Sequence, residues 1–225
     1  GNAMTFPMGV GATTALYPLR PTPDTVNEVM ILVKPSILFA VPTIYAAMIA
    51  NLKKNSIKYQ NLRRCVSAGE ALPSQIGTDW KNITGVDILD GVGSTEMLHI
   101  FLSNKPNDIT YGTSGSAVPG YDLKLVDEYG EEVAIGEIGE LLVKGQSSAM
   151  CYWNKLTKSR NTFEGKWTRT GDKYEKIKDE KYIYSGRTDD MFKVSGLWIS
   201  PFEVEQALVS HEIVLEAAVV AKQDN

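Results

Sequence analysis

The chain has 225 residues, of which 43% are hydrophobic and 22% charged, a composition typical of a soluble globular protein. Its formal net charge of -4 and the absence of a long Lys/Arg run argue against nucleic acid as a partner. No apolar stretch is long enough for a membrane span and no secretory signal is present, so we expect a cytoplasmic protein. Two distant cysteines, Cys65 and Cys151, fit reduced thiols in that compartment.

Helical and strand-like patterns alternate along the first hundred residues. A helix is predicted over 24–34, with Thr22 as its N-cap and Pro23 as its first residue. Further helices are predicted around 44–52 and at 73–81, and buried strands at 36–41, 63–67 and 86–89. This alternation indicates a parallel sheet with crossover helices. Another helix is predicted from Met97 onward.

Short strands separated by turns replace this pattern after about residue 110. They are predicted at 122–126, 139–143, 167–169 and 182–184, as in an antiparallel barrel or meander. A last unit begins near Asp189 with a strand, a helix that Ser200 and Glu203 cap around Pro201, and a strand over 214–221. We therefore expect an α/β chain with a parallel-sheet subdomain at 1–110, a small β-barrel subdomain at 111–188 and the beginning of an α+β domain at 189–225.

A glycine-rich turn after the strand at 86–89 is the first candidate site. It reads Asp90-Gly91-Val92-Gly93-Ser94-Thr95-Glu96. Ligands of open parallel sheets bind beyond the carboxyl ends of the strands, where a helix N-terminus can bind phosphate. The glycines allow close backbone approach, two hydroxyls follow them, and Glu96 is a hard oxygen ligand for the Mg²⁺ of a nucleotide. An ordinary Gly-Ser turn is the alternative, whereas a dinucleotide fingerprint is disfavoured because Glu96 replaces its third glycine.

Three further candidate segments end predicted strands. Ser67-Ala68-Gly69-Glu70 is expected at the same sheet edge, and its small residues would admit a flat ring such as adenine. Thr170-Gly171-Asp172 and Gly186-Arg187 offer a carboxylate for ribose hydroxyls and a guanidinium for hydroxyls or phosphate. Lys193-Val194-Ser195-Gly196 suits a mobile loop that meets a ligand. Taken singly, each segment fits an ordinary turn or junction equally well.

Taken in chain order, these segments resemble the adenylate-forming superfamily of acyl-CoA synthetases, peptide-synthetase adenylation domains and luciferases. That family carries SxGE, GxGxTE, GExxVxG, TGD and GRxDDxxKxxGxxIxPxEVE in this order, and the matching segments are 67–70, 91–96, 139–145, 170–172 and 186–205. The resemblance covers essentially the whole chain. Segments 1–7, 90–104 and 111–115 look closest to benzoate-CoA and hydroxybenzoate-CoA ligases.

The resemblance implies a two-step reaction and a role for each matched residue. A carboxylate attacks the α-phosphorus of ATP to give an acyl-adenylate and pyrophosphate, and the thiol of CoA then displaces AMP. Thr95 and Arg187 would act in the chemistry and Glu96 would hold Mg²⁺. The implied nucleotide-binding residues are Ser67, Ala68, Gly69, Glu70, Gly91, Val92, Gly93, Ser94, Asp172, Lys193 and Gly196. Asp90 and His99 would border the acyl pocket, and Asp189 would be the hinge of the C-terminal domain.

Some features are left open or depart from the family. His99 would share a helix face with Glu96, with a helix-packing histidine as the alternative. Val92 stands where many relatives have an aromatic ring that stacks on adenine. The family's phosphate loop is expected before Gly1 and its adenylation lysine after Asn225. Both ends are therefore expected to be cuts through a larger protein, and this chain alone is expected to catalyse little.

The sequence thus predicts an ATP- and Mg²⁺-dependent aryl-CoA ligase for a benzoate-like acid. Its partners would be small molecules, namely the aromatic acid, ATP and CoA. A nucleotide-binding fragment without catalysis and a ligase for a fatty or amino acid are the alternatives, and a dinucleotide-dependent oxidoreductase is a more distant one. A homodimer and the ring substituents of the acid stay open.

Overall fold

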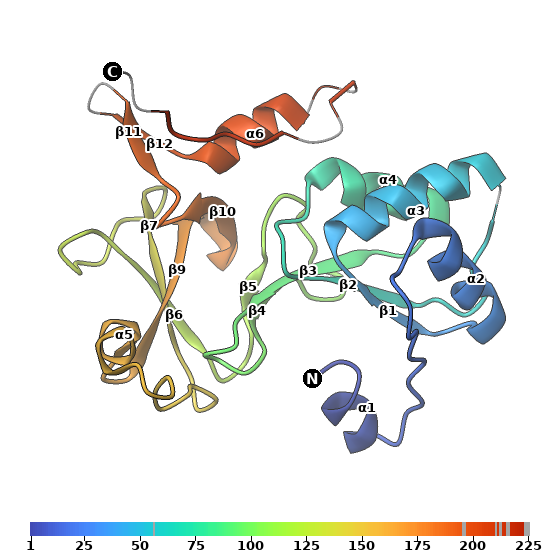
Figure 1. Ribbon diagram of the computed structural model, residues 1–225, viewed down its shortest axis with the longest axis horizontal. Helices are drawn as coiled ribbons and strands as arrows, with labels where there is room; N and C mark the ends of the chain where they lie inside the picture. The colour runs from blue at the N-terminus through green and yellow to red at the C-terminus, as the bar shows by residue number, and fades with distance from the viewer. Residues whose placement is uncertain (56, 195–196, 210, 212, 215–216, 223–225) are drawn as a thin grey trace. The chain divides into compact units, whose positions relative to one another are not determined.

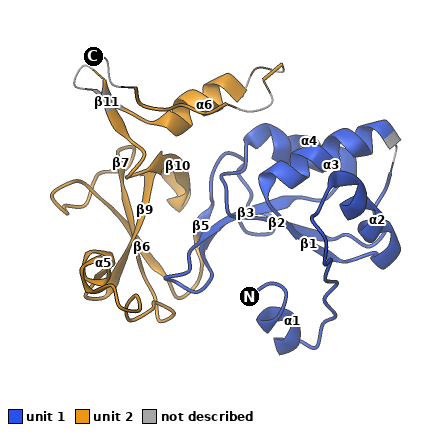
Figure 2. Cartoon of the chain, in the orientation of Figure 1, with its two compact units in different colours: residues 1–116 blue, residues 117–225 orange. Residues whose placement is uncertain are grey.

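The computed structural model describes residues 1–55, 57–194, 197–209, 211, 213–214 and 217–222. The chain forms two compact units, Gly1–Ser116 and Ala117–Asn225 (Figure 2). None of the helices in these described ranges is long and apolar enough to cross a bilayer. The predicted α/β class is confirmed, while the division into three parts at 110 and 188 stays a prediction.

The first unit is built on a five-stranded sheet in the order β1-β2-β3-β4-β5. Strands β1, β2 and β3 pair in parallel, whereas β4 is antiparallel to β3. In the parallel register Ser67 of β2 lies beside Asp90 of β3, so two predicted site segments leave neighbouring strands at one sheet edge. The strands are β1 (Ile37–Ala40), β2 (Arg64–Ser67), β3 (Ile88–Gly93), β4 (Ile100–Ser103) and β5 (Ser116–Ala117).

Helices α2 (Pro23–Val33), α3 (Pro42–Asn55) and α4 (Ser74–Thr84) lie along this sheet (Figure 1). A short helix, α1 (Thr5–Gly9), precedes them. Helix α2 begins as predicted, because the Thr22 hydroxyl accepts the Thr25 N–H at 3.3 Å and Pro23 stands in the first turn. Local capping chemistry therefore sets where this helix starts.

The core of the first unit lies between α3, α4 and the sheet. Trp80 and Tyr45 are fully buried there, with their rings edge to face at 4.9 Å between centroids. The Tyr45 hydroxyl reaches the backbone carbonyls of Leu38 at 3.2 Å and Val66 at 3.0 Å. One phenol thus joins a helix to two neighbouring strands, which holds the sheet edge that carries the predicted site.

The helix predicted from Met97 onward is wrong, because the chain turns after β3 and returns as β4. Leu98 has a φ of 71°, a left-handed conformation that an α-helix does not contain. Phe101 and Leu102 are fully buried in the strand that follows. His99 therefore shares no helix face with Glu96, and this turn offers no helix N-terminus to a phosphate.

The second unit contains an antiparallel sheet in the order β10-β9-β7-β6, with β8 paired to β9. Leu141, Val143 and Tyr174 are buried in it. Helix α5 (Leu156–Thr162) and a 3₁₀ turn at Lys178–Glu180 lie in its connections. The strands are β6 (Asp122–Val126), β7 (Ile138–Lys144), β8 (Phe163–Glu164), β9 (Trp167–Lys176) and β10 (Tyr182–Arg187).

A hairpin and a helix follow β10 in the second unit. The hairpin pairs β11 (Phe192–Val194) with β12 (Leu197–Ile199), and α6 spans Pro201–Val209. Ser200 caps α6 as predicted, since its hydroxyl accepts the Glu203 N–H at 3.4 Å. The same hydroxyl donates to the Ser185 carbonyl of β10 at 2.7 Å. Beside this bond, the Phe202 ring meets Tyr184 edge to face at 4.7 Å.

The strand predicted over 214–221 is not formed by the described residues of that range, 214 and 217–221. A strand needs a partner for its backbone groups, and no described strand pairs with this segment. The Val219 N–H instead donates to the Glu205 carboxylate of α6 at 2.8 Å. A run of apolar residues was therefore not sufficient to predict a strand here.

Candidate functional site

The turn between β3 and β4 is shaped by a close approach of two backbone segments. A Cβ on Gly93 would stand 2.4 Å from the His99 carbonyl oxygen, so a side chain does not fit there. The Ser94 hydroxyl accepts a backbone N–H of the turn at 3.3 Å, and the Leu98 N–H donates to the Thr95 carbonyl at 3.2 Å. Thr95 is exposed. The turn therefore presents a hydroxyl beyond the carboxyl end of β3.

Glu96, the predicted magnesium ligand, is half-buried in the same turn. Within the described residues, no group of three or more His, Cys, Asp or Glu side chains could hold a metal ion. One carboxylate nevertheless fits a Mg²⁺ ion that arrives with a nucleotide, because Mg²⁺ keeps water and phosphate oxygens and takes one or two carboxylates from a protein. Gly91 and Val92 precede this turn within β3.

The loop from β2 to α4 carries the second predicted segment. Ser67 is fully buried at the end of β2, and its Oγ has no hydrogen-bond partner within the described chain. Ala68 is half-buried, while Gly69 and Glu70 are exposed. Gly69 has a φ of 95°, which glycine adopts without strain. Leu72 then returns the loop to the core, where its side chain is buried.

Asp90 lies one strand away from Ser67 and is only 5% exposed. Burial raises the pKa of its carboxyl to about 7, while hydrogen bonds from the backbone N–H groups of Leu72 and Gly91 act in the opposite direction. Its Oδ1 has no hydrogen-bond partner among the described residues. The Asp90 side chain is thus buried, whereas Thr95 is exposed to solvent.

His99 is held by the N-terminal segment of the first unit. Its Nε2 lies 2.8 Å from the Asn2 Oδ1, and the Phe6 ring meets the imidazole edge to face at 4.5 Å. Burial lowers the pKa of His99 below its usual value, which favours the neutral imidazole. Sequence reasoning missed Asn2 and Phe6 as its partners, because nothing in a linear pattern places residues so far apart side by side.

In the second unit, Asp172 of β9 and Arg187 of β10 face each other. The strand register pairs them directly, and the Arg187 Nη1 lies 3.1 Å from the Asp172 Oδ1. A Cβ on Gly171 would stand 3.0 Å from the Arg187 Nη2, so the guanidinium lies against bare backbone. Asp189 is exposed, with its Oδ2 at 3.8 Å from the same nitrogen. The group offers carboxylate oxygens and guanidinium hydrogens to a ligand.

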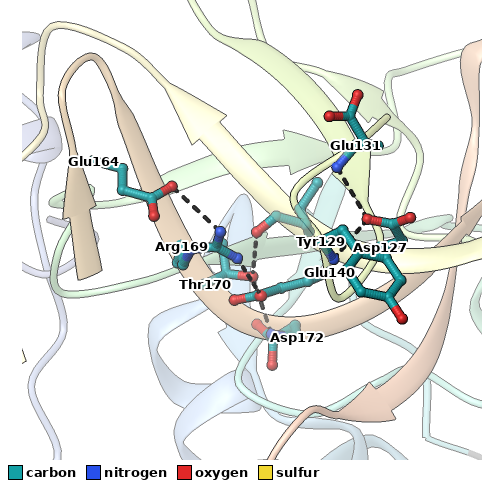
Figure 3. A network of polar contacts seen from close by, with 9 residues as sticks. Asp127, Tyr129, Glu131, Glu140, Glu164, Arg169, Thr170 and Asp172 are labelled. Atoms are coloured by element: carbon teal, nitrogen blue, oxygen red, sulfur yellow. Dashed lines mark hydrogen bonds and ion pairs between the residues drawn. The ribbon is translucent and has the colours of Figure 1, made fainter. Parts of the chain in front are cut away.

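A network of polar contacts supports the strand segment before Asp172 (Figure 3). The Thr170 hydroxyl donates to the Leu141 carbonyl at 2.9 Å and accepts the Asp172 N–H at 3.1 Å. Arg169 lies between Glu140 and Glu164, with N–O distances of 2.7 and 3.3 Å. Sequence reasoning did not foresee these ion pairs, although Glu140 and Arg169 stand in segments that it had singled out.

The last predicted segment is described only in part. Lys193 lies in β11, and Gly196 lies outside the described residues. The structure therefore brings together 67–70 with 90–99 in the first unit, and Asp172 with Arg187 and Asp189 in the second.

A fold of this kind, with these motifs at its strand ends, defines a class of nucleotide-binding enzyme. The chain belongs to the family of AMP-binding enzymes, because the model of that family matches residues 1–153. The 4-hydroxybenzoate–CoA/benzoate–CoA ligase of Rhodopseudomonas palustris is 59% identical over 225 residues, which are 100% of this chain and 42% of that protein. The benzoate–CoA ligase of Thauera aromatica is 54% identical over 225 residues, covering 100% of this chain and 43% of that protein. The chain thus spans less than half the length of these relatives.

Solved structures of similar proteins have the same fold. The anthranilate CoA ligase AuaEII, in complex with anthranoyl-AMP, matches with a TM-score of 0.92 and 47% identity over 98% of this chain and 43% of that chain. The benzoate CoA ligase from Burkholderia xenovorans LB400 matches with a TM-score of 0.91 and 49% identity over 98% of this chain and 44% of that chain.

Proposed function

We propose that the parent protein of this chain is a cytoplasmic, ATP-dependent ligase that activates a benzoate-like acid and transfers it to CoA. The carboxylate of the acid attacks the α-phosphorus of ATP, and pyrophosphate leaves. The sulfur of CoA then attacks the acyl carbon, and AMP leaves. The observation that carries this proposal is the match to AMP-binding enzymes together with 59% identity to a 4-hydroxybenzoate–CoA/benzoate–CoA ligase along the whole chain.

In the first unit, the turn after β3 contacts the phosphate and the loop after β2 flanks the base. The exposed Thr95 hydroxyl donates to the AMP phosphate, which its place in a turn closed by backbone hydrogen bonds supports. The backbone of Gly91, Val92, Gly93 and Ser94 completes that wall. The loop of Ser67, Ala68, Gly69 and Glu70 lies against adenine, since its exposed glycine admits a flat ring.

In the second unit, Asp172 accepts hydrogen bonds from the ribose hydroxyls, because an ionised carboxylate is purely an acceptor. Arg187 holds that carboxylate at 3.1 Å and has further N–H groups to donate to the nucleotide. Asp189 is the hinge of the C-terminal domain, and its exposure supports a position outside a packed core. Lys193 of β11 and Gly196, which lies outside the described residues, complete the proposed nucleotide contacts.

The acid and the metal complete the proposal. Glu96 would hold Mg²⁺, which supplies positive charge to the phosphates when ATP is bound. His99 borders the aromatic ring of the acid, and its lowered pKa supports an uncharged imidazole against that ring. For Asp90, burial favours a supporting role over direct contact with the acid.

Pyrophosphate release by the full-length parent with ATP and benzoate tests the reaction. We expect release with benzoate or a ring-substituted benzoate and its loss in Thr95→Ala and Glu96→Gln. Thr157→Ala, which changes an exposed threonine of α5, is the matched control and should leave release unchanged. Absence of release with any aromatic or short aliphatic acid would refute the assignment. Faster release with an amino acid or a long-chain acid would move the chain to another branch of the family.

A further inference from the structure

The imidazole of His99 is held along one edge by the first residues of the chain. Its Nε2 lies 2.8 Å from the Asn2 Oδ1. A Cβ on Gly1 would stand 2.6 Å from the His99 Cδ2 and 3.0 Å from its Nε2, so the backbone of Gly1 lies against the bond between these two atoms. The Phe6 ring meets the imidazole edge to face, with 4.5 Å between centroids. These contacts fix the place and the rotation of the imidazole.

The backbone that carries His99 is held separately, by the turn between β3 and β4. Leu98 has a left-handed φ of 71°, and the His99 N–H donates to the Met97 carbonyl at 2.9 Å. The His99 carbonyl oxygen lies 2.4 Å from where a Cβ on Gly93 would stand. Among the described residues, Asn2 is the only hydrogen-bond partner of the imidazole nitrogens. The amide of Asn2 can therefore be changed without altering this turn.

The chemistry of the two side chains decides where the imidazole proton lies. An amide oxygen only accepts hydrogen bonds, so the His99 Nε2 is the donor to Asn2. A neutral imidazole carries one proton, which leaves Nδ1 as a bare acceptor. Burial favours this neutral form. Because Nδ1 stands across the ring from the bond between Cδ2 and Nε2, the acceptor is directed away from Gly1 and Asn2.

We propose that Asn2 is a positioning residue for the acid, which fixes the proton of His99 on Nε2 and so makes Nδ1 an acceptor that selects a benzoate with a hydroxyl or amino donor on its ring. This inference rests on the proposed function, in which His99 borders the aromatic ring of the acid. Asn2 acts through the imidazole and contacts no atom of the acid in this role.

Pairs of acids that differ only in a hydroxyl or a methyl group separate hydrogen bonding from size. For the full-length parent we expect kcat/KM for a hydroxybenzoate to exceed that for the matching methylbenzoate about tenfold at one ring position, ortho, meta or para. In Asn2→Leu this ratio should fall below about threefold, because the imidazole then rotates and carries its proton on either nitrogen. The fall should come from the KM for the hydroxybenzoate, with kcat within about twofold of wild type.

Asn2→Asp tests for rescue, because it keeps an oxygen that accepts from Nε2. Its added charge acts on both acids of a pair, so the ratio should stay within about twofold of wild type at about pH 9, where the imidazole is neutral. Asn161→Leu makes the same exchange at an exposed asparagine of α5 and should leave the ratio unchanged. A ratio that persists in Asn2→Leu, or one near unity in wild type at all ring positions, overturns the proposal.

Nitrogen NMR of the full-length parent with isotope-labelled histidine reads the tautomer without turnover, and His99→Gln assigns the signals. We expect the proton on Nε2 in wild type and a mixture of both tautomers in Asn2→Leu. If the parent releases no pyrophosphate with any acid, the proposed reaction fails, and this change of tautomer still supports the positioning role. A proton on Nδ1 in wild type, or an unchanged tautomer in Asn2→Leu, overturns that role.

Discussion

Replacing Asp90 by Asn should change the way in which the stability of the parent depends on pH. Burial raises the pKa of this carboxyl from 3.8 to about 7. A carboxyl with a raised pKa binds its proton more tightly in the folded state. It therefore stabilises the fold at low pH, and this contribution is lost as the pH rises from about 4 to about 7. Because a tenfold change in proton affinity is worth about 1.4 kcal/mol, the full loss is about 4 kcal/mol.

Asparagine does not titrate, so the stability difference between the two proteins isolates this group. The unfolding free energy of wild type minus that of Asp90→Asn should fall by about 2.5 kcal/mol from about pH 5 to about pH 8. Urea unfolding followed by tryptophan fluorescence measures it. In the control Asp79→Asn the difference should stay constant, because the hydrogen bond from Lys53 at 3.0 Å lowers the pKa of Asp79 and keeps it ionised throughout. A constant difference for Asp90 would refute the reasoning.

Three further predictions concern the core, the turn and the thiols. Tyr45→Phe should lower the unfolding free energy by about 1 to 2 kcal/mol, because the hydroxyl that reaches two strand carbonyls is lost; an unchanged urea midpoint would contradict this. Gly93→Ala should lower kcat/KM for ATP at least about tenfold in the pyrophosphate assay, since a Cβ would stand 2.4 Å from a backbone oxygen. Gly9→Ala, where a Cβ meets nothing within 4 Å, should leave it unchanged. Iodoacetamide should label exposed Cys151 and spare Cys65, whose thiol pKa burial raises to about 12; equal labelling in peptide mass maps would contradict this.

The starts of helices and the parallel strands were predictable because their causes are local. Thr22 before Pro23 and Ser200 before Pro201 each supply a capping oxygen and a preset φ within a few residues. The strands β1 to β3 are short apolar runs bounded by turn residues, and the helices between them leave a parallel sheet as the simple solution. The two site segments at its edge follow from that topology.

The remaining features depend on which strands pair with one another, and a linear sequence pattern does not contain that information. The apolar run after Met97 fits a helix or a strand, and the left-handed Leu98 together with the pairing of β4 to β3 decides for the strand. The predicted strand over 214–221 has no strand partner in the described chain. The burial of Asp90 follows from its register with β2, which its place at the head of a glycine-rich segment does not reveal.

The Ser200 hydroxyl makes two hydrogen bonds at once, one to the start of α6 and one to β10. Its hydrogen points to the Ser185 carbonyl, and this orientation leaves a lone pair for the Glu203 N–H of the first helical turn. The end of the helix and its attachment to β10 are therefore energetically coupled, and the Phe202 ring against Tyr184 belongs to the same contact. Because packed contacts of this kind exchange between discrete arrangements, α6 should leave the strand in a single cooperative step and not by gradual sliding.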